Sequence, residues 1–365
     1  MSACVIYIKA GEGTRTLNVK LGKLALYQLS YAREQRKQAY GRPKRVSTFT
    51  MPTTRLAPSP TGALHLGNAR TFLVNWLIAR QKGWKIILRI EDLDGPRIKQ
   101  GAAAQALEDL KWLGIDWDEG PIYQSMRSEK YAAAVRSLID AGLAYGCVCS
   151  RKEVEAASSA PHAEDGSAVY PGVCRGRFAS PEQAAVLTGK PVAIRFEAPT
   201  GKVAFDDLFA GRQEFDVARD LGDFVIAKAD GTAAYQLAVV VDDAEMGITH
   251  IVRGDDLLDS TPRQIMLYRA LGLADRIPKY CHLPLVVGTD GRRLAKRHGD
   301  TRLGYYREQG VEVSRILHLL ARWCGIESAA PGICAADLLD SFALDRIPRG
   351  PIVFTDSDDS WLRSR

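Results

Sequence analysis

The chain has 365 residues, of which 46% are hydrophobic and 25% are charged, and its formal net charge is +6. This length and composition indicate a globular protein of one or two domains, and no apolar run reaches the roughly 18 residues that a membrane-spanning helix needs. Because residues 1–50 hold ten Lys and Arg against two acids, the rest of the chain carries a net charge of −2, so overall basicity gives no argument for a nucleic-acid partner.

Residues 1–50 contain no motif, and their second half, residues 33–45, is basic without the periodicity of a core-forming helix or strand. We expect a poorly ordered extension upstream of a natural start at Met51. A transit peptide is the alternative, because the segment is poor in acids. The apolar stretch near Val5 is too short for a secretory signal.

A strand, a turn and a helix are predicted next, in the run Arg55-Leu-Ala-Pro-Ser-Pro-Thr-Gly-Ala-Leu-His-Leu-Gly-Asn68. The prolines and Gly62 end the strand, and a helix follows from about residue 68 to residue 82. His65, Gly67 and Asn68 then lie at a helix N-terminus, where N–H groups and the helix dipole favour anions. The sequence therefore predicts a nucleotide-binding corner.

A second strand is predicted at Lys85–Ile90, an apolar run that ends in acids, as is typical of a buried parallel strand. Helical spacing follows at Gln100–Leu113 and Ser128–Ala141. This alternation predicts that residues 51–145 form the first half of a doubly wound α/β nucleotide-binding fold. Glu91 lies at the end of the second strand, where such folds bind ligands.

Residues 146–190 are predicted to form an insertion with four candidate metal ligands, which are Cys147, Cys149, Tyr170 and Cys174. Thiolates are preferred ligands of tetrahedral Zn²⁺, and a metal would stabilise a loop with few apolar residues. Free or buried cysteines are the alternative, because Cys-x-Cys is less usual than Cys-x-x-Cys and Tyr is a rare ligand. His162 is a substitute for Tyr170. Seven cysteines without a signal peptide favour a reducing compartment, and so a cytoplasmic location.

The second half of the fold is predicted over residues 191–330. Its predicted strands are Val192–Phe196, Phe224–Lys228 and Gln236–Val241, and its predicted helices are Thr261–Leu271 and Ser314–Trp323. The loop at residues 288–291 precedes the basic run Arg293-Leu-Ala-Lys-Arg-His-Gly299, whose Lys296 can stabilise charge on a phosphorus in transit. Residues 331–365 are predicted to be a short C-terminal tail.

The two nucleotide-handling motifs resemble the HIGH and KMSKS signatures of class I aminoacyl-tRNA synthetases, written here as His65-Leu-Gly-Asn68 and Arg293-Leu-Ala-Lys-Arg297. The first motif ends in Asn instead of His, and the second has Ala in place of Ser. The helix start and the lysine of the two signatures are still present. The Arg-x-Ala-Pro-Ser-Pro-Thr-Gly run and the strand end Arg89-Ile-Glu-Asp-Leu-Asp94 are similar to the glutamyl branch. The resemblance covers about residues 54–327.

The resemblance implies a role for each matched residue. The implied catalytic residues are His65, Asn68 and Lys296, and the implied ATP-binding residues are the same three with Gly67, with Mg²⁺ accompanying ATP. The implied glutamate pocket consists of Arg55, Leu56, Ala57, Pro58, Ser59, Glu91, Tyr235 and Arg253. We assign Glu91 to the α-amino group and Arg253, with Tyr235 and Arg55, to the carboxylates, since a guanidinium binds a carboxylate bidentately. Which arginine meets which carboxylate stays open.

The acceptor is inferred from the length of the chain and from the cysteine pattern. Only 69 of the 365 residues follow Lys296, too few for a separate anticodon-binding domain. The Cys-x-Cys and Tyr-x-x-x-Cys pattern is similar to the zinc site of glutamyl-queuosine tRNA(Asp) synthetases. This branch implies a monomer with one structural Zn²⁺ that activates L-glutamate as glutamyl-adenylate and transfers it to the cyclopentenediol of queuosine in the anticodon loop of tRNA(Asp). The alternatives are a compact glutamyl-tRNA synthetase that charges a tRNA 3′ end, and a catalytically idle RNA-binding relative.

Overall fold

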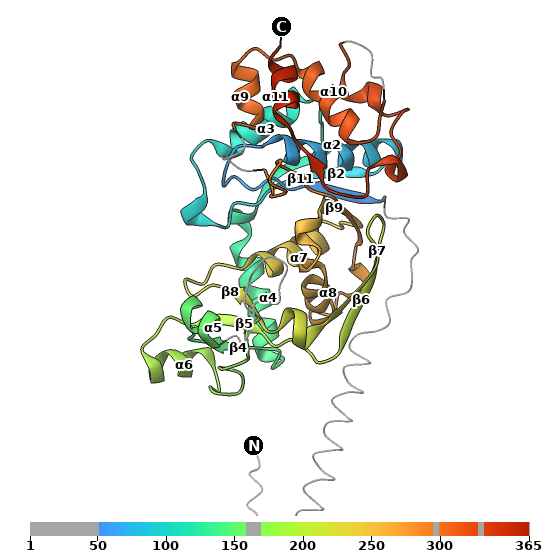
Figure 1. Cartoon of the computed structure of the whole chain (residues 1–365). Helices are drawn as coiled ribbons and strands as arrows, with labels where there is room; N and C mark the ends of the chain where they lie inside the picture. Colours follow the sequence, from blue (N-terminus) through green and yellow to red (C-terminus); the bar gives the residue numbers. More distant parts are fainter. Residues whose placement is uncertain (1–50, 158–168, 295–298, 328–331, 365) are drawn as a thin grey trace, which may run out of the picture. The chain divides into compact units, whose positions relative to one another are not determined.

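The structure is a computed structural model that describes residues 51–157, 169–294, 299–327 and 332–364 (Figure 1). The expected N-terminal extension, the alternative zinc ligand His162 and the basic-loop residue Lys296 lie outside the described residues. No helix of the described part is both long and apolar enough to cross a membrane.

The first sheet is parallel and has the strand order β1-β2-β3. Its strands are β1 (Thr53–Leu56), β2 (Lys85–Ile90) and β3 (Glu119–Tyr123). Helix α2 (Leu66–Gln81) connects β1 to β2, and α3 (Ala102–Trp112) connects β2 to β3. The predicted elements are present, and α2 begins two residues before the predicted start because His65 caps it.

The second sheet has the strand order β7-β6-β10-β9. Its strands are β6 (Lys202–Asp207), β7 (Gly211–Asp216), β9 (His250–Gly254) and β10 (Lys279–Leu283), and α8 (Ser260–Ala270) joins β9 to β10. The pairs β6/β10 and β9/β10 are parallel, whereas β6 and β7 form an antiparallel hairpin. The Thr249 N–H donates to Thr53 O at 2.9 Å, so β9 begins beside β1. The second half of the expected α/β fold is therefore present.

The connection between the two sheets contains a small antiparallel sheet of order β4-β5-β8. Its strands are β4 (Ala144–Cys147), β5 (Ala193–Phe196) and β8 (Phe224–Ala227). Helix α4 (Ser128–Asp140) precedes it, and α5 (Arg151–Ala157) and α6 (Pro181–Thr188) lie between β4 and β5. The candidate zinc ligands thus lie at the end of β4 and in the segment that follows it.

The predicted strand Gln236–Val241 is wrong, because these residues belong to helix α7 (Tyr235–Glu245). Residues 237–244 are all buried, so the helix has no polar face that would reveal its period of 3.6 residues. A short apolar run rich in valine fits a buried strand equally well, and only packing decides between them. Here α7 packs against α4 and α8 rather than pairing with a strand.

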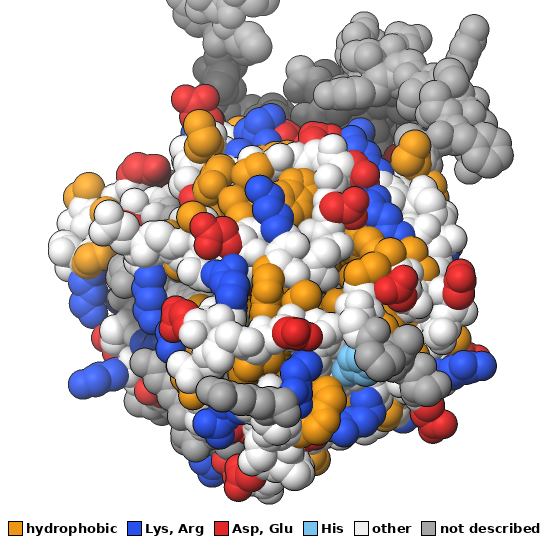
Figure 2. All heavy atoms as spheres, turned by 90° about the horizontal axis from the view of Figure 1, so that it is seen from above, with side chains coloured by type: hydrophobic (Ala, Val, Ile, Leu, Met, Phe, Trp, Pro, Cys, Tyr) orange, Lys and Arg blue, Asp and Glu red, His pale blue; other side chains and the backbone are white. Residues whose placement is uncertain are grey.

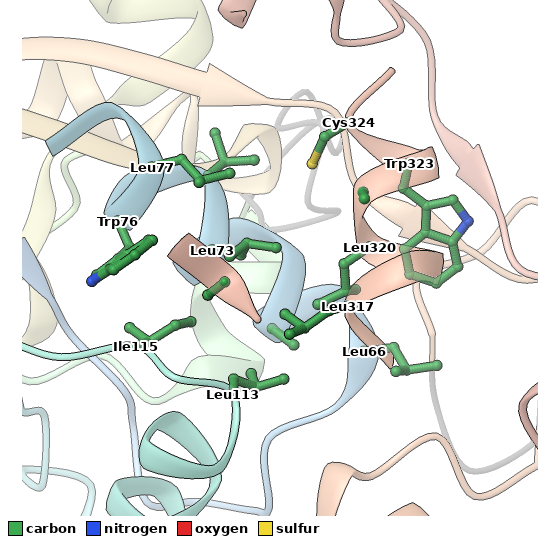
Figure 3. Packing of buried hydrophobic residues seen from close by; sticks show 14 of the residues in the cluster. Leu66, Leu73, Trp76, Leu77, Leu113, Ile115, Leu317, Leu320, Trp323 and Cys324 are labelled. Atoms are coloured by element: carbon green, nitrogen blue, oxygen red, sulfur yellow. The ribbon is translucent and has the colours of Figure 1, made fainter. Parts of the chain in front are cut away.

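A second group of helices covers α2 with apolar side chains. Helices α9 (Leu303–Glu308), α10 (Val313–Trp323) and α11 (Asp356–Arg363) gather near α2 and α3 (Figure 1). Figure 3 shows Leu73 and Leu77 of α2 among the same cluster as Leu317 and Leu320 of α10. The predicted helix at residues 314–323 is therefore present, and its apolar face packs against the nucleotide-binding fold.

The residues predicted to be a tail contribute to this core. Strand β12 (Ile352–Val353) pairs in parallel with β11 (Val286–Val287), which follows β10. Ile352, Phe354 and Leu362 are buried in the cluster that contains α2. The sequence did not indicate these elements, because a strand of two residues leaves no periodic pattern of apolar side chains.

Candidate active site and candidate metal centre

A cavity of about 750 Å³ opens beyond the carboxyl ends of β1, β2 and β9. That volume lies within the range of pockets for small molecules and cofactors. Most of the predicted pocket residues line it, namely Arg55, Ala57, Pro58, Ser59, His65, Gly67, Asn68, Glu91, Tyr235 and Arg253. Leu56 differs, because it is completely buried in the core and does not line the cavity.

The cavity is richer in cations than in anions. Its described lining includes five basic side chains, Arg55, Arg97, Lys228, Arg253 and Arg293, and three carboxylates, Glu91, Asp94 and Asp256. The face seen in Figure 2 differs, since basic, acidic and apolar side chains are intermixed on it. A concave site with an excess of fixed positive charge attracts anionic ligands.

Arg253 lies on β9 with only 4% of its surface exposed. Its Nε–H donates to His282 Nε2 at 3.0 Å, and its Nη2 donates to Thr261 Oγ1 at 2.8 Å. Its Nη1 is buried without a hydrogen-bond partner among the described residues. A buried guanidinium nitrogen without a partner is costly, so the geometry favours a ligand that accepts a hydrogen bond there.

Glu91 is held at the cavity by a buried cation that the sequence analysis missed. Its Oε1 accepts from Arg89 Nη2 at 2.9 Å, and Arg89 Nη1 donates to Asp243 Oδ1 at 2.5 Å. Arg55 Nε lies 3.7 Å from the same Asp243 oxygen. Burial acts to lower the pKa of Arg89, but Asp243, Glu91 and Asp242 together hold it above its usual value. The one visible signal was a lone Arg inside an otherwise apolar strand.

The carboxylate next to Asp243 extends this network away from the cavity. Asp242 Oδ2 accepts from Gln124 Nε2 at 2.7 Å and from Tyr131 Oη at 2.8 Å, and its Oδ1 accepts from Arg127 Nε at 2.6 Å. Gln124 itself lines the cavity. Two adjacent acids in α7 therefore anchor side chains from β2, α4 and the turn before α4, which fixes the floor of the site.

His65 caps α2, and this use of the ring was not predicted. Its Nδ1 accepts the N–H groups of Gly67 at 3.1 Å and Asn68 at 3.4 Å, and its own N–H donates to Asn68 Oδ1 at 3.3 Å. The Leu66 N–H donates to Thr301 O at 3.0 Å. The N–H groups expected to face an anion thus already have partners. Attraction of a phosphate to this corner would act through the helix dipole and the second ring nitrogen.

The pKa of His65 is lowered to about 4 by burial and, to a smaller extent, by Arg293. The ring is therefore neutral near pH 7. Because Nδ1 accepts hydrogen bonds, the proton lies on Nε2, which offers one N–H donor. Gly67 preserves this arrangement, since a Cβ there would lie 3.0 Å from His65 Cε1 and 3.5 Å from Val286 Cβ.

Tyr235 and the loop after β1 complete the described lining. Tyr235 begins α7 and is 37% exposed, so its ring lies at an accessible wall rather than in the core. The Glu91 N–H donates to Pro58 O at 3.0 Å, which ties this loop to the end of β2. The proline-rich turn is thereby fixed beside the acid that follows the neighbouring strand.

Cys147, Cys149 and Cys174 bring their sulfur atoms within 4.8 Å of one another. The sulfur atoms of Cys149 and Cys174 are 3.5 Å apart, and Tyr170 Oη lies 3.4 Å from Cys147 Sγ and 3.5 Å from Cys149 Sγ. Tetrahedral Zn²⁺ with ordinary bond lengths requires about 3.8 Å between two sulfurs and about 3.5 Å between a sulfur and an oxygen. The four side chains therefore fit a metal of this size.

Arg195 of β5 lies against the four candidate ligands. Its Nε donates to Cys147 Sγ at 3.3 Å, and its guanidinium is centred 3.8 Å from the ring centroid of Tyr170. Three thiolates and a phenolate would outweigh the charge of one Zn²⁺, so a neighbouring cation offsets the remaining negative charge. Sequence reasoning missed this residue, because β5 is paired with β4 only in the folded sheet.

Comparisons with known proteins show what this chain is similar to. A sequence model described as "tRNA synthetases class I (E and Q), catalytic domain" matches residues 52–354. A Glutamyl-Q tRNA(Asp) synthetase of Symbiobacterium thermophilum is 48% identical over 308 residues, which cover 82% of this chain and 94% of that protein. Its counterpart in Rhodopirellula baltica is also 48% identical, over 83% of this chain and 96% of that protein.

Longer relatives match the same region. The Glutamate–tRNA ligase of Geotalea uraniireducens is 42% identical over 85% of this chain but only 65% of its own length. Among solved structures, a glutamate tRNA ligase from Elizabethkingia meningosepticum in complex with its amino acid has a TM-score of 0.72 and 27% identity, and the match covers 86% of this chain and 69% of that one.

Proposed function

The chain belongs to the class I tRNA synthetases for glutamate and glutamine, and from this premise we propose that it activates L-glutamate with ATP and transfers it to queuosine in tRNA(Asp). Membership of the family makes it an ATP-using ligase of the aminoacyl-tRNA synthetase type. The family leaves two features to be proposed, which are the amino acid and the acceptor.

The observation that supports glutamate as the substrate is that Arg55, Arg253 and Glu91 line the same cavity. Glutamate has two carboxylates and one ammonium, so a complementary pocket needs two cations and one anion. Arg253 Nη1 is buried without a hydrogen-bond partner among the described side chains and backbone, which suits it to a carboxylate oxygen. Arg55 supplies the second cation of the lining, although its Nε lies 3.7 Å from Asp243 Oδ1. Glu91, fixed by Arg89, is the acceptor for the α-ammonium, and Tyr235 closes the accessible wall.

Activation proceeds by attack of a glutamate carboxylate oxygen on the α-phosphorus of ATP. A new P–O bond forms as the bond to pyrophosphate breaks, and no base is needed because the carboxylate is ionised near pH 7. We propose that His65 binds a phosphate oxygen through Nε2–H, which has no hydrogen-bond partner among the described residues, while the N–H groups of Gly67 and Asn68 keep its ring in position. Lys296 is proposed to neutralise charge on the phosphate, and Mg²⁺ accompanies ATP through phosphates and water.

In the second step a hydroxyl oxygen attacks the activated carbonyl carbon, so an ester forms, AMP leaves with the electron pair of the broken C–O bond, and the hydroxyl proton is released to solvent. We propose that this hydroxyl belongs to the cyclopentenediol of queuosine. The support is the greater identity to the Glutamyl-Q tRNA(Asp) synthetases, 48% against 42% for the Glutamate–tRNA ligase, together with coverage of almost the whole length of the former. The spacing of the three cysteines and Tyr170, which is similar to the zinc site of that branch, adds to the support.

The zinc site is proposed to be structural. Cys147, Cys149, Cys174 and Tyr170 would hold one Zn²⁺, which would join the end of β4 to residues 170–174. A bound metal of this type contributes folding free energy because the unfolded chain has no preformed site. Thiols are kept reduced in the cytoplasm, where they remain able to bind a metal, so we propose that the protein acts there.

The proposal is tested by transfer of labelled L-glutamate, with ATP and Mg²⁺, to purified tRNA. The three matched substrates are tRNA(Asp) with queuosine, tRNA(Asp) without queuosine and unmodified tRNA(Glu). We expect label only on the first. Label on tRNA(Glu) would instead show a compact charging enzyme, and absence of glutamate-dependent ATP turnover would support a catalytically idle relative. Arg253→Lys serves as a matched variant, because it keeps the charge but removes the planar donor arrangement.

A further inference from the structure

Arg253 is held from behind by two buried side chains that the proposed reaction does not use. Its Nε–H donates to His282 Nε2 at 3.0 Å, and His282 Nδ1 lies 2.6 Å from Asp207 Oδ2. Both partner side chains are completely buried. The three residues lie on β9, β10 and β6, and the strand register places His282 directly opposite Arg253. The sheet itself therefore sets the spacing of this chain of hydrogen bonds.

The direction of these hydrogen bonds follows from the arginine. A guanidinium has donors only, so His282 Nε2 is the acceptor and the ring proton lies on Nδ1, which donates to Asp207. Asp207 Oδ1 accepts the N–H groups of Phe209 at 2.9 Å, Ala210 at 2.8 Å and His282 at 3.1 Å. Burial acts to raise the pKa of Asp207, but the bonds from His282, Ala210 and Phe209 lower it overall. Asp207 is thus an ionised acceptor that fixes the tautomer of His282.

The other nitrogens of Arg253 are divided between the protein and the cavity. Nη2 donates to Thr261 Oγ1 at 2.8 Å and to Leu257 O at 3.3 Å. Nη1 has no hydrogen-bond partner within the part of the chain that the structure describes, although Arg253 lines the cavity. With Nε and Nη2 occupied, the guanidinium plane is fixed and only Nη1 remains for a ligand.

We propose that Asp207 and His282 are positioning residues, which hold the guanidinium of Arg253 in the orientation that binds a carboxylate of L-glutamate. This inference rests on the proposed function, because it takes glutamate as the ligand of Arg253. Neither positioning residue lines the cavity. We expect their effect on glutamate affinity, whereas ATP is proposed to bind near the start of α2, where His65 lies.

The test reverses the direction of the hydrogen bonds between Asp207, His282 and Arg253. In Asp207→Asn the amide oxygen keeps the three backbone bonds, so the amide N–H faces His282 Nδ1 and drives the ring proton to Nε2, opposite the Arg253 Nε–H. Loss of a hydrogen bond to a charged group predicts that the Kd for L-glutamate rises roughly 10- to 100-fold, measured by titration calorimetry. The Kd for ATP should change by less than about twofold, as befits a group that does not contact ATP.

Two further variants separate positioning from simple destabilisation. His282→Gln keeps an acceptor for Arg253 Nε while removing the ring, so it should retain glutamate affinity better than Asp207→Asn. Asp206→Asn makes the same chemical change at the neighbouring carboxylate, which is 79% exposed and pairs with Arg212, and it should leave both affinities unchanged. If Asp207→Asn binds glutamate as tightly as Asp206→Asn does, the positioning role is refuted.

A measurement without glutamate keeps this inference separate from the proposed function. ¹⁵N NMR of the histidine ring should show His282 protonated at Nδ1 in the unchanged protein and at Nε2 in Asp207→Asn. The opposite tautomer in the unchanged protein would overturn the inference whatever the ligand. Failure of the unchanged protein to bind L-glutamate, with the expected tautomer present, would instead overturn the proposed function and with it the purpose assigned to Asp207 and His282.

Discussion

Replacing Arg89 by methionine should destabilise the protein far more than removal of an exposed ion pair. Arg89 is completely buried and lies 2.5 Å from Asp243 and 2.9 Å from Glu91. Among the described residues, its loss leaves Asp243, also completely buried, with Arg55 at 3.7 Å as its one ion-pair partner. Removal of one member of a buried ion pair typically costs about 3–5 kcal/mol, because the remaining charge is uncompensated. Methionine fills much of the volume, so the loss reports charge rather than a cavity.

The assay is urea unfolding followed by circular dichroism at constant pH and salt. Arg212→Met is the matched control, since Arg212 pairs with Asp206 at 3.0 Å and both side chains are more than 60% exposed. An exposed pair of this kind contributes about 0–1 kcal/mol. Adding Asp243→Asn to Arg89→Met should recover part of the loss by removing the unpaired charge. Equal destabilisation by Arg89→Met and Arg212→Met would refute the reasoning.

Three further predictions concern pH, the basic loop and the metal. The pKa values of His65, His250 and His282 are each lowered to about 4, chiefly by burial. The unfolded chain therefore binds more protons than the folded chain between about pH 6.5 and pH 4, so the free energy of unfolding should fall as pH falls through this window. His250→Gln should reduce the slope near pH 5 by about one proton, and an unchanged slope would contradict a neutral folded ring. Lys296→Ala should slow glutamate-dependent ATP turnover by about 10²-fold or more while leaving urea unfolding unchanged, and a turnover rate equal to that of the unchanged protein would reject its role. Elemental analysis should find one Zn per chain, and Cys149→Ser should lower both zinc content and the unfolding midpoint; a zinc-free, equally stable protein would refute the site.

The nucleotide-binding half of the fold was predictable because its elements have strong local patterns. Strand β2 has an apolar centre at residues 86–88, and α2 follows a turn marked by prolines and glycine. Helix α7 escaped prediction because tertiary burial on every side removed its amphipathic period. Strands β11 and β12 escaped because each has two residues and exists only through pairing with the other.

In the candidate site, the residues that line the cavity were predicted, whereas the residues that support them were not. Glu91 was predicted because it follows a strand pattern, whereas Arg253 was implied only by the family resemblance, and the fold brings both to one cavity. The residues that hold them, Arg89 and His282, carry no local pattern, since their partners are separated from them by as much as 154 positions. The use of His65 Nδ1 as a helix cap likewise depends on a rotamer that the motif does not specify.

The sequence alone thus determined the type of chemistry, because the motif residues, the strand ends and the closely spaced cysteines each lie within short segments of the chain. Only the tertiary structure decided which side chains support that chemistry. Buried charges such as Arg89 and Asp243 are tolerable only when a distant partner compensates them, and the choice of that partner is made by sheet register and helix packing.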